Sequence, residues 1–289
     1  MRYLLQKLNH CLAKMKNKDL KIGACIMVHN MAPFIGACIK SLQWVDGIFI
    51  YDDHSIDGSV DVALDQSEIP IKIEYSKNKD VAFKRGELET RNYVVDQAFK
   101  ELDVDIMVLA DADELFSSEI RPKIIESFSK PDTDGIMFSS WHLYDEKNYI
   151  HFWEAKISGV DMIDPHTRVI KRGRRFTPLF EDGSHPTLEP TKNTVCLHGH
   201  YHFHLKYHNK STLPNYSIFF LPERPTKKDV QPYLRALPFD LPNDVKTALS
   251  LVHWDNLPLY KETPHHSSNR IKFDDPAEAL IHPKDRINI

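Results

Sequence analysis

The chain is poor in cysteine and in long apolar runs, and each shortage excludes a class of protein. It contains four cysteines, Cys11, Cys25, Cys38 and Cys196. They show no spacing typical of a metal or redox site, and therefore indicate reduced thiols in a cytosolic protein. No apolar stretch approaches the roughly 18 residues that a membrane-spanning helix needs. The N-terminus also lacks the apolar core and cleavage site of a secretory signal, so we expect a cytoplasmic location.

The charge balance and the missing motifs are equally restrictive. The formal net charge is only −4, from 37 Lys and Arg against 41 Asp and Glu. A general nucleic-acid-binding protein is usually strongly basic, so we expect no nucleic-acid partner. The sequence has no internal repeat and no His-Glu-x-x-His motif, and the second absence argues against a zinc hydrolase. At 289 residues, the chain is long enough for one large α/β domain with an appendage.

What the sequence does have, from residue 21 onward, is an alternation of apolar strands with helices. We predict strands at 22–28, 48–51, 71–75 and 106–110, and helices at 33–44, 58–66 and 84–101. This alternation predicts a mostly parallel, Rossmann-like α/β sheet with helices on both faces. The regularity weakens later. There we predict strands at 136–143, 167–171 and 194–204 and short helices near 229–236 and 243–252.

Two acidic clusters follow strands of this predicted sheet. The first is Asp52-Asp53-His54-Ser55-Ile56-Asp57-Gly58-Ser59, and the second is Asp111-Ala112-Asp113-Glu114. Ligands gather at the carboxyl ends of strands in such sheets. Carboxylates one residue apart suit a hard cation such as Mg²⁺ or Mn²⁺ that is shared with substrate phosphates. The alternatives are an Asx-rich surface turn for the first cluster and a helix cap for the second.

Two further motifs complete a pattern. The first strand ends in Val28-His29-Asn30, and Arg91-Asn92 lies on the helix before the fourth strand. Together with the acidic clusters, these motifs resemble the nucleotide-sugar glycosyltransferases of GT-A fold, most closely the family 2-like group. The resemblance implies transfer of a sugar from a nucleoside diphosphate donor, foremost a UDP-sugar, to a hydroxyl of a glycan or glycolipid. It also implies Mn²⁺ or Mg²⁺, inversion, and a role in cell-surface polysaccharide or lipopolysaccharide synthesis.

The resemblance assigns roles to particular residues of both clusters. Asp111 and Asp113 are predicted to hold the metal that bridges the two phosphates. Arg91 is predicted to touch the diphosphate, although it could instead pair with Glu87 or Glu89 on its own helix. The predicted donor-binding residues are Asn30, Asp52, Asp53, Asp57, Arg91 and Asp111.

Two later segments supply the remaining candidates. Residues 197–204 carry histidines at alternate positions, which would share one face of a strand. Family members often recruit a late histidine to the metal or diphosphate, and we predict His200 and then His202, although imidazole also suits zinc. An inverting transferase needs a base. We predict Glu181 and Asp182, with Glu114 and Asp145 as competitors. The basic stretch at 171–175 either contacts an anionic acceptor or forms a solvated loop.

On this interpretation residues 21–210 form the GT-A catalytic domain, with a donor half at 21–115 and an acceptor half at 116–210. Residues 211–289 form a proline-rich, partly helical extension. An amphipathic helix is predicted at 1–20, where it either packs on the parent domain or contacts the inner membrane face. The alternative functions are a sugar nucleotidyltransferase, whose usual glycine-rich phosphate loop is absent after the first strand, and a catalytically inactive GT-A binding protein.

Overall fold

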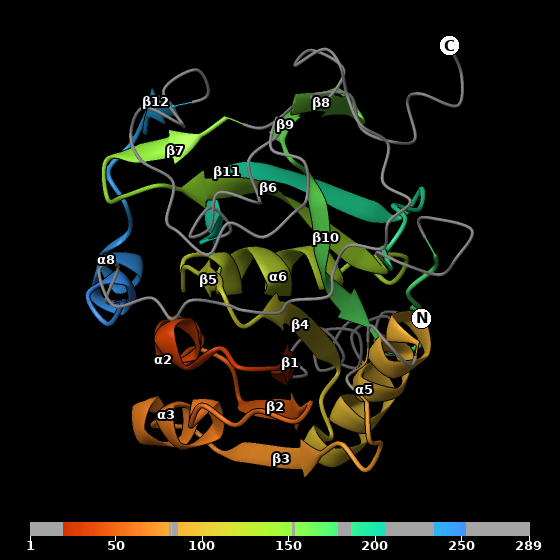
Figure 1. Cartoon of the computed structure of the whole chain (residues 1–289). Coiled ribbons are helices and arrows are strands. Elements are labelled where there is room, and N and C mark those ends of the chain that lie inside the picture. The colour runs from red at the N-terminus through yellow and green to blue at the C-terminus, as the bar shows by residue number, and fades with distance from the viewer. Residues whose placement is uncertain are drawn as a thin grey trace, which may run out of the picture.

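The structure is a computed structural model, and Figure 1 shows the arrangement of its helices and strands. The described residues are 20–80, 82, 86–151, 154–178, 186–205 and 234–252. The predicted catalytic residues Glu181 and Asp182, and the predicted helix at 1–20 up to residue 19, lie outside them. No helix in the described part of the chain is long and apolar enough to cross a membrane.

Ten strands of the described chain form one sheet in the order β12-β7-β6-β10-β4-β1-β2-β3, with β11 beside both β5 and β6. These strands are β1 (Ile22–Val28), β2 (Gly47–Asp52), β3 (Ile71–Tyr75), β4 (Ile106–Asp111), β5 (Glu114–Phe116), β6 (Gly135–Leu143), β7 (Asn148–Ile150), β10 (His166–Lys171), β11 (Thr194–His204) and β12 (Leu234–Ala236). β1 to β4 are parallel, whereas β10 runs antiparallel to β4 and β6. A separate hairpin pairs β8 (Glu154–Ile157) with β9 (Val160–Ile163).

Helices cover both faces of the parallel strands, as Figure 1 shows. They are α2 (Ala32–Ser41), α3 (Ser59–Gln66), α5 (Glu87–Leu102), α6 (Ile120–Phe128) and α8 (Asn243–Leu249). Ile22 and Ile26 of β1 pack with α2, α3 and α6, whereas Cys25 packs with α5. A strand buried on both faces needs apolar residues at consecutive positions, which explains the continuous apolar runs. The predicted fold class, a mostly parallel α/β sheet with helices on both faces, is confirmed.

Several predicted elements agree with the structure residue for residue. Strands 22–28, 71–75 and 194–204 are β1, β3 and β11. The predicted helix near 229–236 is wrong where it is described, because residues 234–236 form β12, which pairs antiparallel with β7. Pairing at the edge of the sheet here overrides the local preference of a short segment. Helix α6 is absent from the predicted elements.

The described part of the predicted C-terminal extension shares a core with the main domain. Val245, Ala248 and Leu249 of α8 pack with Phe34 and Ala37 of α2 in one apolar cluster. Burial of this kind stabilises by roughly 25 cal/mol for each Å² of apolar surface removed from water. The boundary between domain and extension stays a prediction, but α8 contributes to the core on which α2 rests.

Candidate active site

The two acidic clusters lie at the same edge of the sheet, at the carboxyl ends of β2 and β4. The register of β1 pairs Val28 with Asp52 of β2 and Met27 with Asp111 of β4. The backbone N–H of Asp53 also donates to the carbonyl of Val28, at 2.8 Å. Residues far apart in the chain therefore lie at one edge of the sheet, formed by the carboxyl ends of β1, β2 and β4, which we call the rim. Open parallel sheets bind ligands at this edge.

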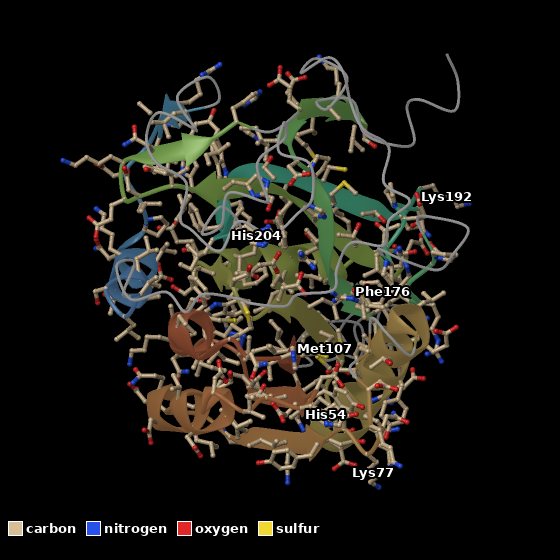
Figure 2. The ribbon with its side chains drawn as sticks, in the orientation of Figure 1. His54, Lys77, Met107, Phe176, Lys192 and His204 are labelled. Atoms are coloured by element: carbon tan, nitrogen blue, oxygen red, sulfur yellow. The ribbon has the colours of Figure 1, made fainter. Side chains whose placement is uncertain are left out.

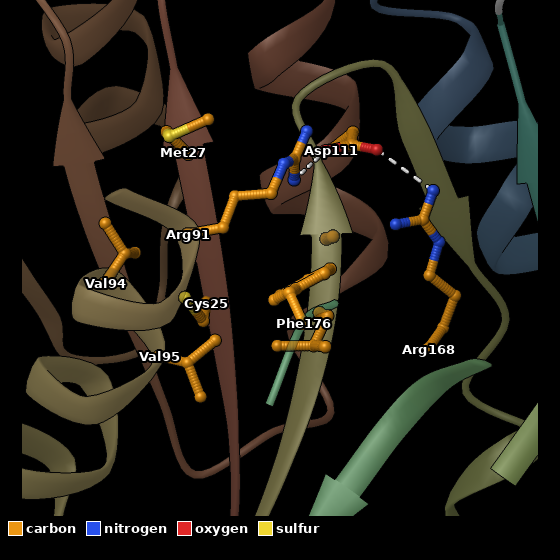
Figure 3. Close-up of a pocket in the computed structure, with 10 residues that line it drawn as sticks. Cys25, Met27, Arg91, Val94, Val95, Asp111, Arg168 and Phe176 are labelled. Carbon is orange, nitrogen blue, oxygen red and sulfur yellow. Dashed lines mark hydrogen bonds and ion pairs between the residues drawn. The ribbon is translucent and has the colours of Figure 1, made fainter. Parts of the chain in front are cut away.

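Asp111 lies between two arginines, as Figure 3 shows. Its Oδ1 accepts from Nη1 of Arg91 at 3.1 Å, and its Oδ2 accepts from Nη2 of Arg168 at 2.9 Å. Nε of Arg91 also donates to Glu87, at 2.9 Å, so this arginine makes both a helix pair and a rim contact. Burial would raise the pKa of Asp111, but the two guanidinium groups hold that pKa well below its usual range. Asp111 is therefore ionised.

Arg168 reaches this position through an irregularity in β10. The register of β10 against β6 shifts between Thr167 and Val169, so Arg168 is the extra residue of a bulge. Bulges re-aim side chains and are frequent beside active sites. The guanidinium of Arg168 contacts both Asp111 and Glu114, and only 11% of its side chain is exposed. The sequence prediction does not name this arginine, which is the second residue of the predicted strand 167–171.

Glu114, the last residue of the second acidic cluster, is fully buried. Its Oε2 accepts the backbone N–H of Asp111 at 3.0 Å, while its Oε1 contacts Arg168 and lies 3.1 Å from Nε2 of His202. Burial would raise the pKa of Glu114, but Arg168 and then His202 outweigh burial and lower it. Glu114 therefore acts as a buried anion that holds the turn after β4.

Asp113 lies beside a histidine of β11. Its Oδ2 is 3.4 Å from Nε2 of His204, and its carbonyl accepts the N–H of Leu205 at 2.9 Å. The antiparallel pairing of β11 with β5 sets Glu114 opposite His204 and brings this histidine to the rim. Figure 2 labels His204 near the middle of the molecule. A carboxylate oxygen and an imidazole nitrogen thus converge at the predicted metal position.

The other predicted histidine lies elsewhere. The register of β11 against β6 shifts between Leu197 and His202, so the histidines do not follow one uninterrupted alternation. The ring of His200 stacks on Phe239, with ring centroids 3.4 Å apart, and lies 6.3 Å from the ring of Trp141. Partial burial lowers the pKa of His200. The structure therefore puts His204, and not His200, next to Asp113.

The donor set fits a metal that is shared with a substrate. In the described part of the chain, no group of three or more His, Cys, Asp and Glu side chains is arranged to hold a metal ion by itself. Asp113 and His204 offer two ligand atoms 3.4 Å apart, and Mg²⁺-type sites commonly use one or two protein ligands with substrate phosphates and water. Both oxygens of Asp111 are paired with arginines instead. Ligation by Asp111, Asp113 and His200 stays a prediction.

Asp52 and Asp53, at the end of β2, differ in their contacts. Oδ2 of Asp53 accepts the N–H of Ala82 at 2.5 Å, which fixes the chain ahead of α5. Oδ2 of Asp52 accepts the N–H of Ser55 at 3.3 Å. Oδ1 of Asp52 is buried and has no hydrogen-bond partner among the described residues. A buried acceptor of this kind is costly unless a ligand or water donates to it.

Asn30 and Asp57 join the loop after β1 to the loop after β2. Oδ1 of Asn30 accepts the N–H of Ile56 at 2.8 Å, and the backbone N–H of Asn30 donates to Ser55 at 3.0 Å. Oδ2 of Asp57 accepts the N–H of Ala32 at 2.9 Å. Asn30 has a φ of 52°, a conformation that asparagine tolerates better than most residues. In these contacts both side chains hold the rim together; donor binding by either stays a prediction.

The basic stretch at 171–175 and Asn92 hold one segment against α5. The side chain of Asn92 makes two hydrogen bonds to the backbone of Phe176. It accepts the N–H at 2.9 Å and donates to the carbonyl at 3.2 Å. The arginines of the stretch bond to protein groups as well. The partners are the Phe99 carbonyl for Arg172, Asp134 for Arg174 and Asp96 for Arg175. These contacts hold the stretch against the fold, but Arg172 and Arg175 are exposed, so the anionic-acceptor and solvated-loop alternatives both stay predictions.

A small cavity lies between α5 and the sheet, directly beneath this rim (Figure 3). Its volume is about 20 Å³, and its lining includes Cys25, Val95, Phe176, Arg91 and Asp111. Burial raises the pKa of the Cys25 thiol to about 12, so this thiol is protonated at neutral pH. Since a cavity needs roughly 10–15 Å³ for one water, this one is far too small for a nucleotide sugar.

A family model described as Glycosyl transferase family 2 matches residues 24–188, which is more than half of the chain. The chain belongs to this family. Family membership makes it an enzyme of the glycosyltransferase class. No curated protein sequence matches this glycosyltransferase.

Solved structures give distant matches to this family 2 glycosyltransferase. S. aureus TarS matches with 11% identity and a TM-score of 0.45, over 65% of this chain and 61% of that one. Its complex with UDP matches with 15% identity and a TM-score of 0.37, over 43% and 37%. Glucosyl-3-phosphoglycerate synthase from Mycobacterium tuberculosis, with Mn²⁺ and UDP, matches with 15% identity and a TM-score of 0.32, over 45% and 47%. The glycosyltransferase thus spans less than two thirds of the length of each of these chains.

The two competing base candidates differ in burial, because Glu114 is fully buried whereas Asp145 is half-buried. Oδ1 of Asp145 accepts the backbone N–H groups of Lys147 and Asn148, each at 2.8 Å, and so holds the turn between β6 and β7. Glu114 is fully buried and paired with Arg168. Both carboxylates therefore support the fold through these contacts, and a role as base stays a prediction for either.

Proposed function

We propose that this family 2 enzyme transfers a sugar, with inversion, from a UDP-sugar to a hydroxyl of a glycan or glycolipid. We further propose that transfer depends on Mn²⁺ or Mg²⁺ held by Asp113 and His204. The contact that supports this assignment is the 3.4 Å approach of Asp113 Oδ2 to His204 Nε2 at the carboxyl ends of the strands. The motif resemblance supports cell-surface polysaccharide or lipopolysaccharide synthesis as its setting. Family membership favours transfer over the nucleotidyltransferase alternative.

The charges at the rim give a physical reason for a metal requirement. Two arginines face four carboxylates in this cluster, namely Arg91 and Arg168 against Glu87, Asp111, Asp113 and Glu114. With the histidines neutral, its formal charge is −2. A diphosphate is also an anion, and at about 4 Å each unit-charge pair interacts by about 4 kcal/mol at an effective dielectric near 20. A bound divalent cation would cancel this repulsion and stabilise the charge that grows on the leaving diphosphate.

The chain's own residues then have distinct tasks. Arg91 and Arg168, held by Asp111, keep two guanidinium groups at the side of the rim that we assign to the diphosphate. To the buried Oδ1 of Asp52, which has no hydrogen-bond partner among the described residues, we assign a hydrogen bond from the base or ribose. Such a buried acceptor discriminates against a donor that leaves it without a partner.

The metal assignment is tested by titrating UDP into the chain in a calorimeter. We expect UDP to bind with Mn²⁺ and to bind at least about tenfold more weakly in EDTA, which corresponds to about 1.4 kcal/mol. Asp113→Asn should lose this dependence on metal. Asp161→Asn is the matched control, because Asp161 lies in an exposed surface pair with Lys156. Equal UDP affinity of the parent chain in EDTA and in Mn²⁺ would contradict the assignment.

A further inference from the structure

A buried carboxylate lies between two histidines beside the proposed metal site. Asp164, in the connection between β9 and β10, is only 3% exposed. Its Oδ2 lies 2.5 Å from Nε2 of His142 and 3.2 Å from Nε2 of His166. The side chain of His142 is fully buried, whereas 38% of the side chain of His166 is exposed. The three side chains therefore form a polar path from the core to the surface.

This path borders the rim on two sides. β10 runs antiparallel to β4, with Val169 opposite Val108, so the start of β10 lies beside the carboxyl end of β4. His166 is the first residue of β10, and Arg168, two residues further along, contacts Asp111 at 2.9 Å. Two residues span at most about 7 Å of backbone, so the backbone of His166 lies close to that of Arg168, beside the carboxyl end of β4.

The buried end of the path approaches the proposed metal ligand. The ring of His142 lies 5.4 Å, between centroids, from the ring of His204. His204 in turn lies 3.4 Å from Asp113. The histidine–aspartate path is therefore adjacent to the proposed site without sharing a residue with it.

The backbone and the charge of Asp164 are both unusual for a structural turn. Asp164 has a φ of 37° although it is not glycine, and Pro165 follows it. Residues held in the left-handed region cluster at functional sites, where the surrounding structure fixes them. Burial opposes ionisation of Asp164, but His166 and His142 hold its pKa well below its usual range. The carboxylate is thus a fixed anion behind a half-exposed imidazole.

We propose that His166 is the general base of sugar transfer, with Asp164 as its positioning residue and His142 as the anchor of Asp164. This proposal rests on the proposed function. The ring nitrogen of His166 that faces away from Asp164 takes the proton of the acceptor hydroxyl. The acceptor oxygen forms a bond to the anomeric carbon, and the carbon–oxygen bond to the diphosphate breaks with its electron pair leaving on the phosphate oxygen. Asp164 orients the imidazole and stabilises the imidazolium that forms.

The test compares the parent chain with His166→Ala, Asp164→Asn and the control His198→Ala, whose histidine is exposed and bonds to Ser139. UDP release is measured with Mn²⁺ from UDP-glucose, UDP-galactose and UDP-GlcNAc, with water and methyl glycosides as acceptors. UDP affinity and melting temperature are measured for every variant. Asparagine suits position 164, because it tolerates a positive φ.

We expect His166→Ala to lower the rate at least about 100-fold, as loss of a general base does. UDP affinity should stay within about twofold, and added imidazole should restore part of the rate. Asp164→Asn should lower kcat with little change in KM for the donor. A His166→Ala rate within about threefold of the parent overturns the proposal, as does a loss that imidazole does not rescue. A parent chain that neither binds UDP nor releases it overturns the proposed function as well.

Discussion

Replacing Arg168 by methionine should cost a large part of the stability of this protein. The change leaves the fully buried Glu114 with the N–H of Asp111, the ring of His202 and, at 3.9 Å, the ring of His204 as its remaining partners. Removing one partner of a buried ion pair typically costs about 3–5 kcal/mol, because the other charge stays buried and uncompensated. Arg175→Met is the matched control. Its pair with Asp96 is half-exposed, and exposed pairs contribute about 0–1 kcal/mol.

Acidification should reduce the effect of this replacement. In the parent protein the pKa of Glu114 is lowered, since Arg168 and His202 outweigh burial. A carboxyl group with a lowered pKa in the folded state contributes stability that is present above its unfolded pKa, near 4.3, and is lost as the pH falls. Without Arg168, burial dominates and the pKa of Glu114 rises. The folded variant then takes up a proton more readily, so the stability gap to the parent is widest near pH 7 and narrows below about pH 5.

Urea unfolding followed by circular dichroism, from pH 4 to pH 8, measures both quantities. The double variant Arg168→Met/Glu114→Gln should recover part of the lost stability at pH 7, because it removes the uncompensated charge. A stability loss below about 1 kcal/mol at pH 7, equal to that of the Arg175 control, would refute the assigned role of Arg168. A stability difference between parent and variant that widens as the pH falls would show that Glu114 is not the uncompensated charge.

The remaining predictions concern Asn92 and Asp52. Asn92→Ala should lower the free energy of unfolding by about 1–3 kcal/mol, because it leaves the backbone of Phe176 without both side-chain bonds. An unchanged urea midpoint would show that solvent replaces those bonds. Asp52→Ala should weaken UDP binding in Mn²⁺ at least about tenfold, the effect of losing about 1.4 kcal/mol, while the melting temperature changes little. Unweakened UDP binding, measured by calorimetry, would remove Asp52 from the donor site.

The parallel half of the fold could be predicted because each strand carries its own signal. β1 and β4 are apolar at consecutive positions, since α5 covers one face and the other helices cover the opposite face. The end of the apolar run also predicts that Asp111 lies at a strand end, and β4 does end at Asp111. Helix α6 was also open to prediction. Ile120, Ile124 and Phe128 recur at helical spacing, and Pro122 is tolerated in the first turn of a helix.

The partners of Asp111 and Asp113 could not be predicted in the same way. Arg168 reaches Asp111 because β10 contains a bulge, and His204 reaches Asp113 because the register of β11 shifts before His202. Both irregularities are properties of strand pairing between distant segments, which alternation along one strand does not encode. If β11 alternated uniformly, its histidines would all lie on one face. Because the register shifts, His200 and His204 have different surroundings.

The position of Asp111 between two arginines limits what an Asp111→Asn substitution can show about metal binding. Asparagine at position 111 would remove the only charge that the two arginines share, and two cations would then repel each other across a neutral amide. An inactive Asp111→Asn enzyme is therefore the expected result whether or not that aspartate ever touches a metal. Asp113 bonds to neither guanidinium in the described contacts. A substitution at position 113 therefore tests a metal requirement without disturbing the two arginines.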